Sequence, residues 1–125
     1  MKLSPTQTDE MSLSAFGEEA RAMLMRHDYS GLVNRFGYAL TYDRAPAVAI
    51  EADFLSAVAS PHNVRSDTCP PTLVKYFAPN DTGLFAVVEC TVPVAPGAAV
   101  FLELIVAGTG EEKHITVEDI SGVAA

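Results

Sequence analysis

The feature that most constrains this chain is a two-residue alternation of side chains in its second half. Between residues 84 and 94 every second residue is apolar, namely Leu84, Ala86, Val88, Cys90, Val92 and Val94, and the same period returns at Val100, Leu102, Leu104 and Val106 after Ala95-Pro96-Gly97. Successive side chains of a strand point to opposite faces, so this pattern predicts two long strands with one buried face. Residues 73–77 and 113–120 add two further candidates, and turns at residues 79–83 and 108–110 complete an antiparallel meander of four strands.

Helical spacing dominates the first half of the chain. From Ser14 onward a first helix is indicated by one apolar face, formed by Phe16, Ala20, Met23 and Leu24. Asp28 is placed to cap a second, short helix that stops at Gly37. Pro46 suits the first turn of a third helix, which Pro61 ends. Residues 38–42 favour a short strand, with continuation of the second helix as the alternative, and residues 60–72 favour an irregular crossing.

Together these patterns predict the α+β class, with two to three N-terminal helices packed on a curved antiparallel sheet. The sheet consists of the four-stranded C-terminal meander, with room for one short additional strand at residues 38–42. Residues 1–13 show no sustained period and are expected to form a flexible lead-in. Residues 14–125 are then expected to form a single α+β domain, since a chain of this length supports one core.

Charge limits the classes of partner. Sixteen acidic and eight basic residues give a net charge of −8, which disfavours phosphate backbones and anionic lipid, so neither nucleic acid nor membrane is expected to bind. A basic protein partner fits this charge, and so does a purely solubilising role. No secretory or membrane-spanning pattern is present, so a cytoplasmic location is expected, with Cys69 and Cys90 as reduced thiols. No cofactor or metal-binding motif is present in the sequence, and neither is expected.

Folding the meander in two dimensions brings charged residues together. If the turn at residues 95–97 centres its hairpin so that Val94 faces Ala98, Glu89 lies opposite Glu103. A following turn centred near Thr109 would place His114 beside Glu103, and the first hairpin would place Thr72 near Glu89. This row would share a sheet face with Phe85, Val87, Phe101 and Ile105. Glu89, Glu103 and His114 are therefore the candidate catalytic residues, suited to proton transfer; an ordinary solvated cross-strand pair is the alternative.

Four other residues are weaker candidates. His27 is expected at a helix C-terminus, where the helix dipole explains it, and His62 has no ligand partner near it in the sequence. Tyr38 and Tyr42 either line a ligand cavity or are strand aromatics with a polar tip. No nucleophile elbow, phosphate-binding loop or dinucleotide fingerprint occurs.

Over residues 15–123 the order of expected elements resembles the nuclear-transport-factor-like (cystatin-like, SnoaL-like) superfamily. That order is a helix, the junction HDYSGL at residues 27–32, a second helix, a short strand, a third helix and an antiparallel meander. The segment KHITVEDI at residues 113–120 also looks like the closing strand of small bacterial domains of uncharacterised function. The first resemblance implies a curved sheet around helices with a pocket between them, used by isomerases, dehydratases, cyclases and non-catalytic binding domains. The catalytic Asp-His or Tyr-Asp arrangements of the enzymatic members have no match here, and one of the usual strands is missing, so no functional residue is transferred.

The sequence therefore favours a non-enzymatic protein-interaction or ligand-binding module of bacterial type, such as an acidic inhibitor or immunity-like protein. The alternative is a small cone-fold enzyme (an isomerase, dehydratase or cyclase) or a binder of an apolar small molecule, with its pocket between the helices and the face of Glu89, Glu103 and His114. The sequence leaves open whether the protein is an enzyme, although the missing motifs argue against it. Apolar residues on both sheet faces also raise the possibility of a homodimer formed through the sheet.

Overall fold

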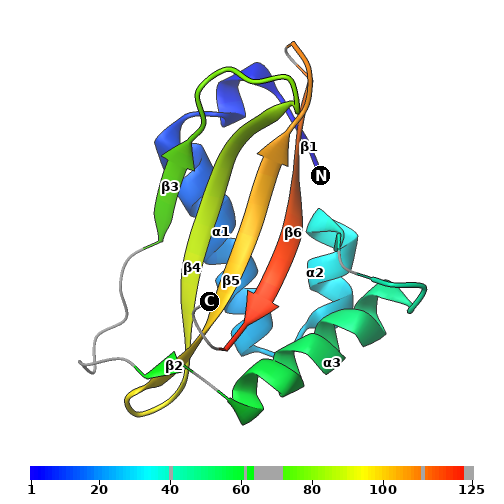
Figure 1. Cartoon of the computed structure of the whole chain (residues 1–125), viewed down its shortest axis with the longest axis vertical. Helices are drawn as coiled ribbons and strands as arrows, with labels where there is room; N and C mark the ends of the chain where they lie inside the picture. Colours follow the sequence, from blue (N-terminus) through cyan, green and yellow to red (C-terminus); the bar gives the residue numbers. More distant parts are fainter. Residues whose placement is uncertain (40, 61, 64–71, 111, 123–125) are drawn as a thin grey trace.

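A computed structural model describes residues 1–39, 41–60, 62–63, 72–110 and 112–122, and only the backbone of residues 62–63. The described part begins with helices and ends with an antiparallel sheet, so the predicted α+β class is confirmed (Figure 1). The helices are α1 (Glu10–Met25), α2 (Tyr29–Phe36) and α3 (Pro46–Ala59), preceded by a 3₁₀ turn at Pro5–Gln7. The strands are β1 (Lys2–Leu3), β2 (His62–Asn63), β3 (Leu73–Tyr76), β4 (Leu84–Ala95), β5 (Ala98–Ala107) and β6 (Lys113–Ser121).

The meander predicted from the alternation forms the centre of the sheet. The strands follow the order β1-β6-β5-β4-β3, and β2 pairs with the part of β5 that extends beyond β6. The β4–β5 register agrees with the prediction from Ala86 opposite Val106 to Pro93 opposite Ala99. An irregularity after Pro93 makes Ala95, rather than the expected Val94, the partner of Ala98. The long run of regular pairs before this irregularity fixes which face of both strands is buried.

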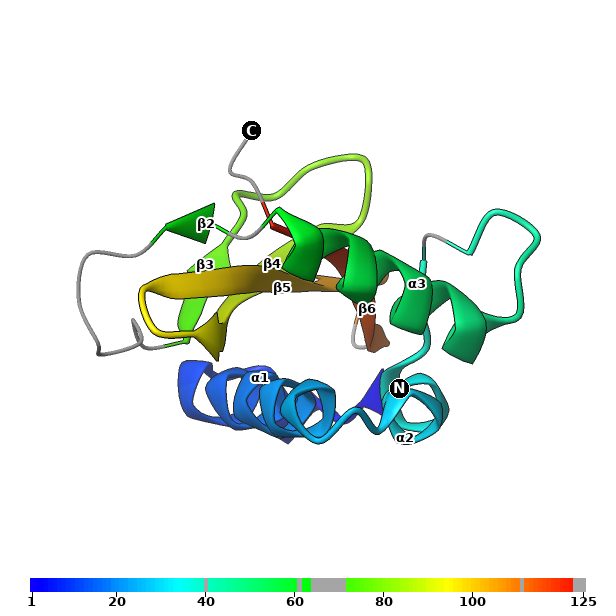
Figure 2. The ribbon, with the colours of Figure 1, turned by 90° about the horizontal axis from the view of Figure 1, so that it is seen from below.

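The hydrophobic core lies between the sheet and α1 and α2, which cover the same face (Figure 2). Helix α1 packs on β4 through its buried residues Leu13, Gly17, Ala20 and Leu24. At Gly17 an added Cβ atom would lie 2.7 Å from Val88 Cγ1 and 2.8 Å from Thr72 Cγ2, so a glycine allows this close approach. The Cys90 thiol is free and buried, and it donates to the Gly17 carbonyl at 3.4 Å. The buried stripe differs from the expected one because Phe16 and Met23 lie at its margin, only partly buried.

Helices α2 and α3 follow their predicted boundaries. The Asp28 carboxylate accepts from the Gly31 amide at 3.1 Å and caps α2, and Gly37 ends the helix with φ at +82°. Pro46 stands in the first turn of α3, whose buried residues include Ile50, Phe54 and Ala57. Helix α3 packs on α2 and runs beside β6 (Figures 1 and 2). The predicted helix signals were therefore correct for both elements.

Residues 1–13, which were expected to form a flexible lead-in, instead contain a strand and the start of α1. Leu3 is only 2% exposed, and β1 pairs with β6 through Lys2 opposite His114 and Leu3 opposite Lys113. Helix α1 already begins at Glu10, with the Asp9 carboxylate accepting from the Ser12 amide at 3.2 Å. Two residues are too few to show a strand period, which is why this segment carried no pattern. Residues 1–13 thus complete the sheet edge and the start of α1.

The strand expected at residues 38–42 is also wrong. Tyr38 forms a single parallel bridge with Val117, and the chain then turns through Tyr42 and Asp43, whose φ angles are +48° and +65°. Left-handed backbone at two successive residues is incompatible with a strand. Most of the expected irregular crossing at residues 60–72, including Cys69, lies outside the described residues, although residues 62–63 pair with β5.

Candidate functional site

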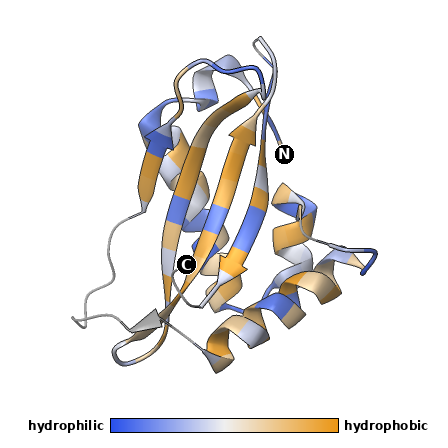
Figure 3. Ribbon diagram, viewed as in Figure 1, coloured by the Kyte–Doolittle hydropathy of each residue, from blue (hydrophilic) through white to orange (hydrophobic). Residues whose placement is uncertain are grey.

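The sheet face opposite α1 carries the predicted carboxylate pair. Glu89 of β4 and Glu103 of β5 are directly opposite each other, as expected. The next strand contributes Asp119, which is opposite Glu103. Figure 3 shows hydrophilic segments at neighbouring positions of β4, β5 and β6. We call Glu89, Glu103 and Asp119 the carboxylate row, and the sheet face that bears them the open face.

His114 does not belong to this row, so the predicted Glu103–His114 pair is wrong. Strand β5 ends at Ala107, the φ angles of Gly108 and Gly110 are +150° and +60°, and β6 starts at Lys113. The connection between the two strands is longer than expected, so His114 is opposite Ala107, and a separate irregularity between Glu103 and Leu104 places Asp119 opposite Glu103. Four residues of strand place His114 about 13 Å along β5 from the level of Glu103. The proposed acid–base set of two glutamates and a histidine is therefore not assembled.

The other end of the predicted row is displaced by one residue. Leu73, and not Thr72, is opposite Glu89. The Thr72 hydroxyl donates instead to the Glu18 carboxylate of α1 at 2.5 Å, on the opposite side of the sheet. Val87, Phe101 and Ile105 share the open face through the register, whereas Phe85 falls at an irregularity between Leu84 and Ala86. A one-residue shift moves a side chain to the other face, which accounts for Thr72.

The carboxylate row lines a hollow of about 340 Å³. Its walls are Glu89, Glu103, Asp119, Phe101, Leu102 and Ser121. Lys75 Nζ lies 3.3 Å from Glu89 Oε1, but Glu103 makes no hydrogen bond or ion pair with any described residue. Burial raises the pKa of Glu103, and the charges of Glu89, Asp119 and Glu118 raise it further. The Lys75 charge lowers the pKa of Glu103 and so offsets part of this effect, but Lys75 forms its ion pair with Glu89.

Substituting Glu103 by glutamine is expected to stabilise the protein at pH 7 by up to about 1 kcal/mol, because like charges directly opposite on a sheet are unfavourable. A raised pKa in the folded state means that ionisation costs stability as the pH rises above the ordinary glutamate pKa. The gain should therefore disappear near pH 3.5, where the carboxyl is protonated in both states. Urea unfolding at the two pH values measures it, with the exposed Glu51→Gln as the control. A loss of stability at pH 7 would contradict the unpaired state of Glu103.

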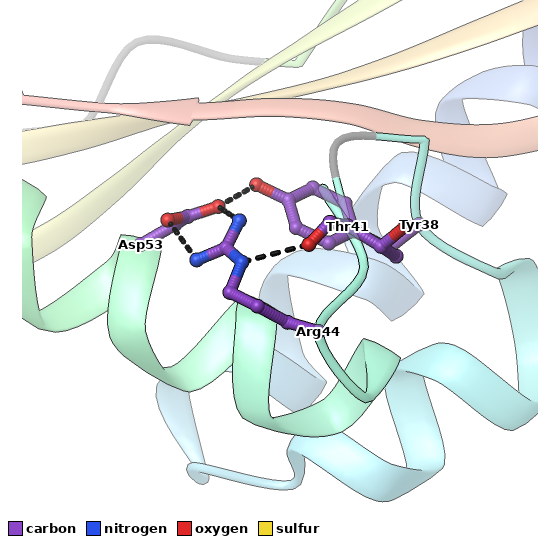
Figure 4. Close-up of polar contacts among 4 residues, drawn as sticks. All are labelled: Tyr38, Thr41, Arg44 and Asp53. Carbon is purple, nitrogen blue, oxygen red and sulfur yellow. Dashed lines mark hydrogen bonds and ion pairs between the residues drawn. The ribbon is translucent and has the colours of Figure 1, made fainter.

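A second polar cluster joins α3 to the segment that precedes it (Figure 4). Arg44 forms a two-pronged ion pair with Asp53, with Nη1–Oδ1 at 3.0 Å and Nη2–Oδ2 at 3.1 Å. The buried Tyr38 hydroxyl donates to Asp53 Oδ2 at 2.5 Å, and Arg44 Nε donates to the Thr41 carbonyl at 2.7 Å. We call Tyr38, Arg44 and Asp53 the α3 clasp. The sequence analysis named Tyr38 but neither of its partners.

Electrostatics indicate that the α3 clasp is a structural element. Burial opposes ionisation of Asp53, but hydrogen bonds from Arg44 and Tyr38 and the Arg44 charge bring its pKa below the usual value. Burial and the bond to Asp53 raise the pKa of Tyr38. Both values move away from neutrality, whereas general acid–base catalysis requires a pKa near the working pH. The clasp is therefore suited to holding α3 in place.

Tyr42 lies at the surface beside the clasp, and its ring is 5.9 Å from the Arg44 guanidinium carbon. A hollow of about 420 Å³ lies next to it, lined in part by Tyr42, Asp53, Ser56, Asp119 and Ser121. This hollow shares Asp119 and Ser121 with the hollow of the carboxylate row. Of the two tyrosines, Tyr42 thus lines a cavity, and Tyr38 is an aromatic with a bonded polar tip.

His27 and His62 were the two weaker histidine candidates. His27 follows the C-cap of α1, as expected, and the side chain of His62 lies outside the described residues. Among the residues that the structure describes, no group of three histidine, cysteine, aspartate or glutamate side chains is placed to hold a metal ion. No described helix has both the length and the apolar character needed to cross a bilayer.

The comparisons with known proteins return no relative. No protein-family model, no curated protein and no solved structure matches this chain. The resemblance to the nuclear-transport-factor-like superfamily therefore stays a prediction, and function is argued from the chain's own residues.

Proposed function

We propose that this protein is a non-enzymatic interaction module that binds a basic segment of a partner protein on its open face. One lysine or arginine side chain of the partner enters the hollow between Glu89, Glu103 and Asp119. The observation that carries the proposal is the direct register of these three carboxylates across β4, β5 and β6, around a hollow of about 340 Å³.

Geometry of the hollow favours a cation. Glu103 has no partner among the described residues, and two carboxylates flank it, so an incoming ammonium or guanidinium group would offset the mutual repulsion. Hydrogen bonds between charged donors and carboxylates are among the strongest in proteins. Phe101 supplies an aromatic wall, and aromatic rings attract cations. The hollow thus offers both charge and ring contacts to one basic side chain.

The net charge of the whole chain also favours a basic partner. A net charge of −8 steers basic proteins toward the surface and accelerates their encounter, particularly at low salt. The carboxylate row would then select the binding position. This division between long-range attraction and local fit is the one expected of an inhibitor or immunity-like protein.

The two alternative uses of the open face are less favourable. A cone-fold enzyme would need the acid–base set of Glu89, Glu103 and His114, and His114 lies opposite Ala107, away from the row. A homodimer formed face to face would bring two carboxylate rows together, and desolvating like charges is costly. A basic partner avoids both difficulties.

The proposal is tested with a fluorescein-labelled tetra-arginine peptide as the probe. In anisotropy titrations at low salt, the triple variant Glu89→Gln, Glu103→Gln, Asp119→Asn is expected to bind at least tenfold more weakly than the natural protein. The matched control, Glu10→Gln, Glu51→Gln, Asp81→Asn, removes the same three charges from exposed positions off the open face and should change binding less than threefold. Equal losses in the two variants would show only non-specific attraction and would refute the proposed site.

A further inference from the structure

A different hollow, of about 350 Å³, lies between the C-terminal end of α1, helix α3 and the end of β4. Its lining includes Met25, His27, Phe54, Leu55, Val58 and residues 92–94. The ends of these elements meet in the lower part of Figure 1, and the hollow shares no lining residue with the hollow of the carboxylate row. In contrast to the hollow on the open face, none of its lining residues is acidic.

The walls of this hollow are apolar and partly uncovered. Phe54 is only 4% exposed, whereas Met25 and Leu55 are 44% and 54% exposed. A ligand that covers large apolar side chains at the rim of a concave site removes their surface from water, which favours binding by about 25 cal/mol per Å². The volume is at the lower end of the range of small-molecule pockets, which runs from about 300 to 1,000 Å³. The volume of the hollow therefore suits a small apolar molecule.

One polar side chain lines the hollow. His27 is held in left-handed backbone with φ at +60°, and its ring lies 5.8 Å from Phe54 and 5.9 Å from Tyr29. Its imidazole makes no hydrogen bond to any described residue. The imidazole can therefore serve a ligand.

From these features we infer that the hollow binds a small apolar molecule with one anionic head. The hydrocarbon part lies against Phe54, Leu55 and Val58, and the head accepts a hydrogen bond from His27. Charge complementarity selects the head group, because the one polar side chain of this lining is an imidazole and the lining holds no acid, in a chain of net charge −8. Such binding is separate from the capture of a basic partner on the open face.

Octanoate, 1-octanol and octylamine serve as probes of equal chain length in titrations followed by two-dimensional ¹H–¹⁵N NMR. Octanoate is expected to shift the amides of residues 25–27, 54–58 and 92–94 and to saturate. It should bind about tenfold more tightly than octanol, and octylamine should bind most weakly. Unsaturated, scattered shifts, or octylamine binding as tightly as octanoate, would overturn the inference.

Two variants assign the contacts. Asparagine tolerates left-handed backbone, so His27→Asn should keep the fold, retain octanol binding and remove most of the preference for octanoate. Leu55→Asp should weaken octanoate binding at least tenfold, because it places a carboxylate at the rim. Val48→Asp is the matched control on the same helix, 59% exposed and outside the hollow, and should leave binding unchanged. An unchanged octanoate preference in His27→Asn, or equal effects of the two aspartates, would refute the site.

Discussion

Replacing Leu104 by alanine should lower the free energy of unfolding by about 3 kcal/mol, the largest single effect expected in this protein. Leu104 is fully buried in the middle of β5, opposite Val88 on β4 and Val117 on β6. Truncation removes apolar contacts on both sides and leaves a cavity between the sheet and its helices, which packed neighbours refill only partly. Urea unfolding should show a midpoint lower by about 1.5 M or more.

Ile105→Ala is the matched control, because Ile105 is the next residue on β5 but lies on the open face, partly exposed. Its truncation should cost about 1 kcal/mol, since the side chain keeps part of its contact with water in the folded state. Comparable losses at Leu104 and Ile105 would show that the core does not lie on the α1 side of the sheet.

The contrast between these neighbours explains why the centre of the fold could be predicted. Strand side chains alternate strictly, and the short turn at residues 95–97 leaves few ways to pair β4 with β5. The pair Glu89 and Glu103 followed directly from that register. Helix caps such as Asp28 and Gly37 act within a few residues, so the limits of α2 were predicted equally well.

Features that depend on longer turns or distant contacts could not be predicted in the same way. The connection between β5 and β6 is longer than its sequence suggested, which moved His114 out of the row, and an irregularity beside Glu103 brought Asp119 into it. Strand β1 is defined only by its partner β6, and two residues carry no period. The apolar hollow near His27 requires the relative placement of α1, α3 and β4, which no local pattern specifies.

The two proposed sites divide the surface by charge. The open face gathers three carboxylates from three adjacent strands, whereas the apolar hollow has an imidazole and no acid in its lining. The two proposals therefore assign a basic side chain and an apolar anion to different parts of the domain. Each test uses variants that leave the other site intact, so either proposal can fail alone.

The α3 clasp gives the second large expected effect. Asp53→Ala should lower the free energy of unfolding by about 2 kcal/mol, because the buried Tyr38 hydroxyl loses a hydrogen bond to a charged acceptor. Arg44 loses its two-pronged partner in the same variant. Glu51→Ala, which removes an exposed carboxylate from the same helix, should cost less than 0.5 kcal/mol, the usual limit for ordinary surface substitutions of about that size.

A double-mutant cycle separates the clasp from general packing. Tyr38→Phe removes only the hydroxyl, and its effect should largely vanish when Asp53 is already alanine, giving a coupling of about 1 to 2 kcal/mol. Because the pKa of Asp53 is lowered in the folded state, the advantage of the natural protein over Asp53→Asn should hold at neutral pH and shrink as the pH falls below about 4. Additive effects of Tyr38→Phe and Asp53→Ala, or a pH-independent difference, would mean that the carboxylate does not fasten α3 to the segment containing Tyr38.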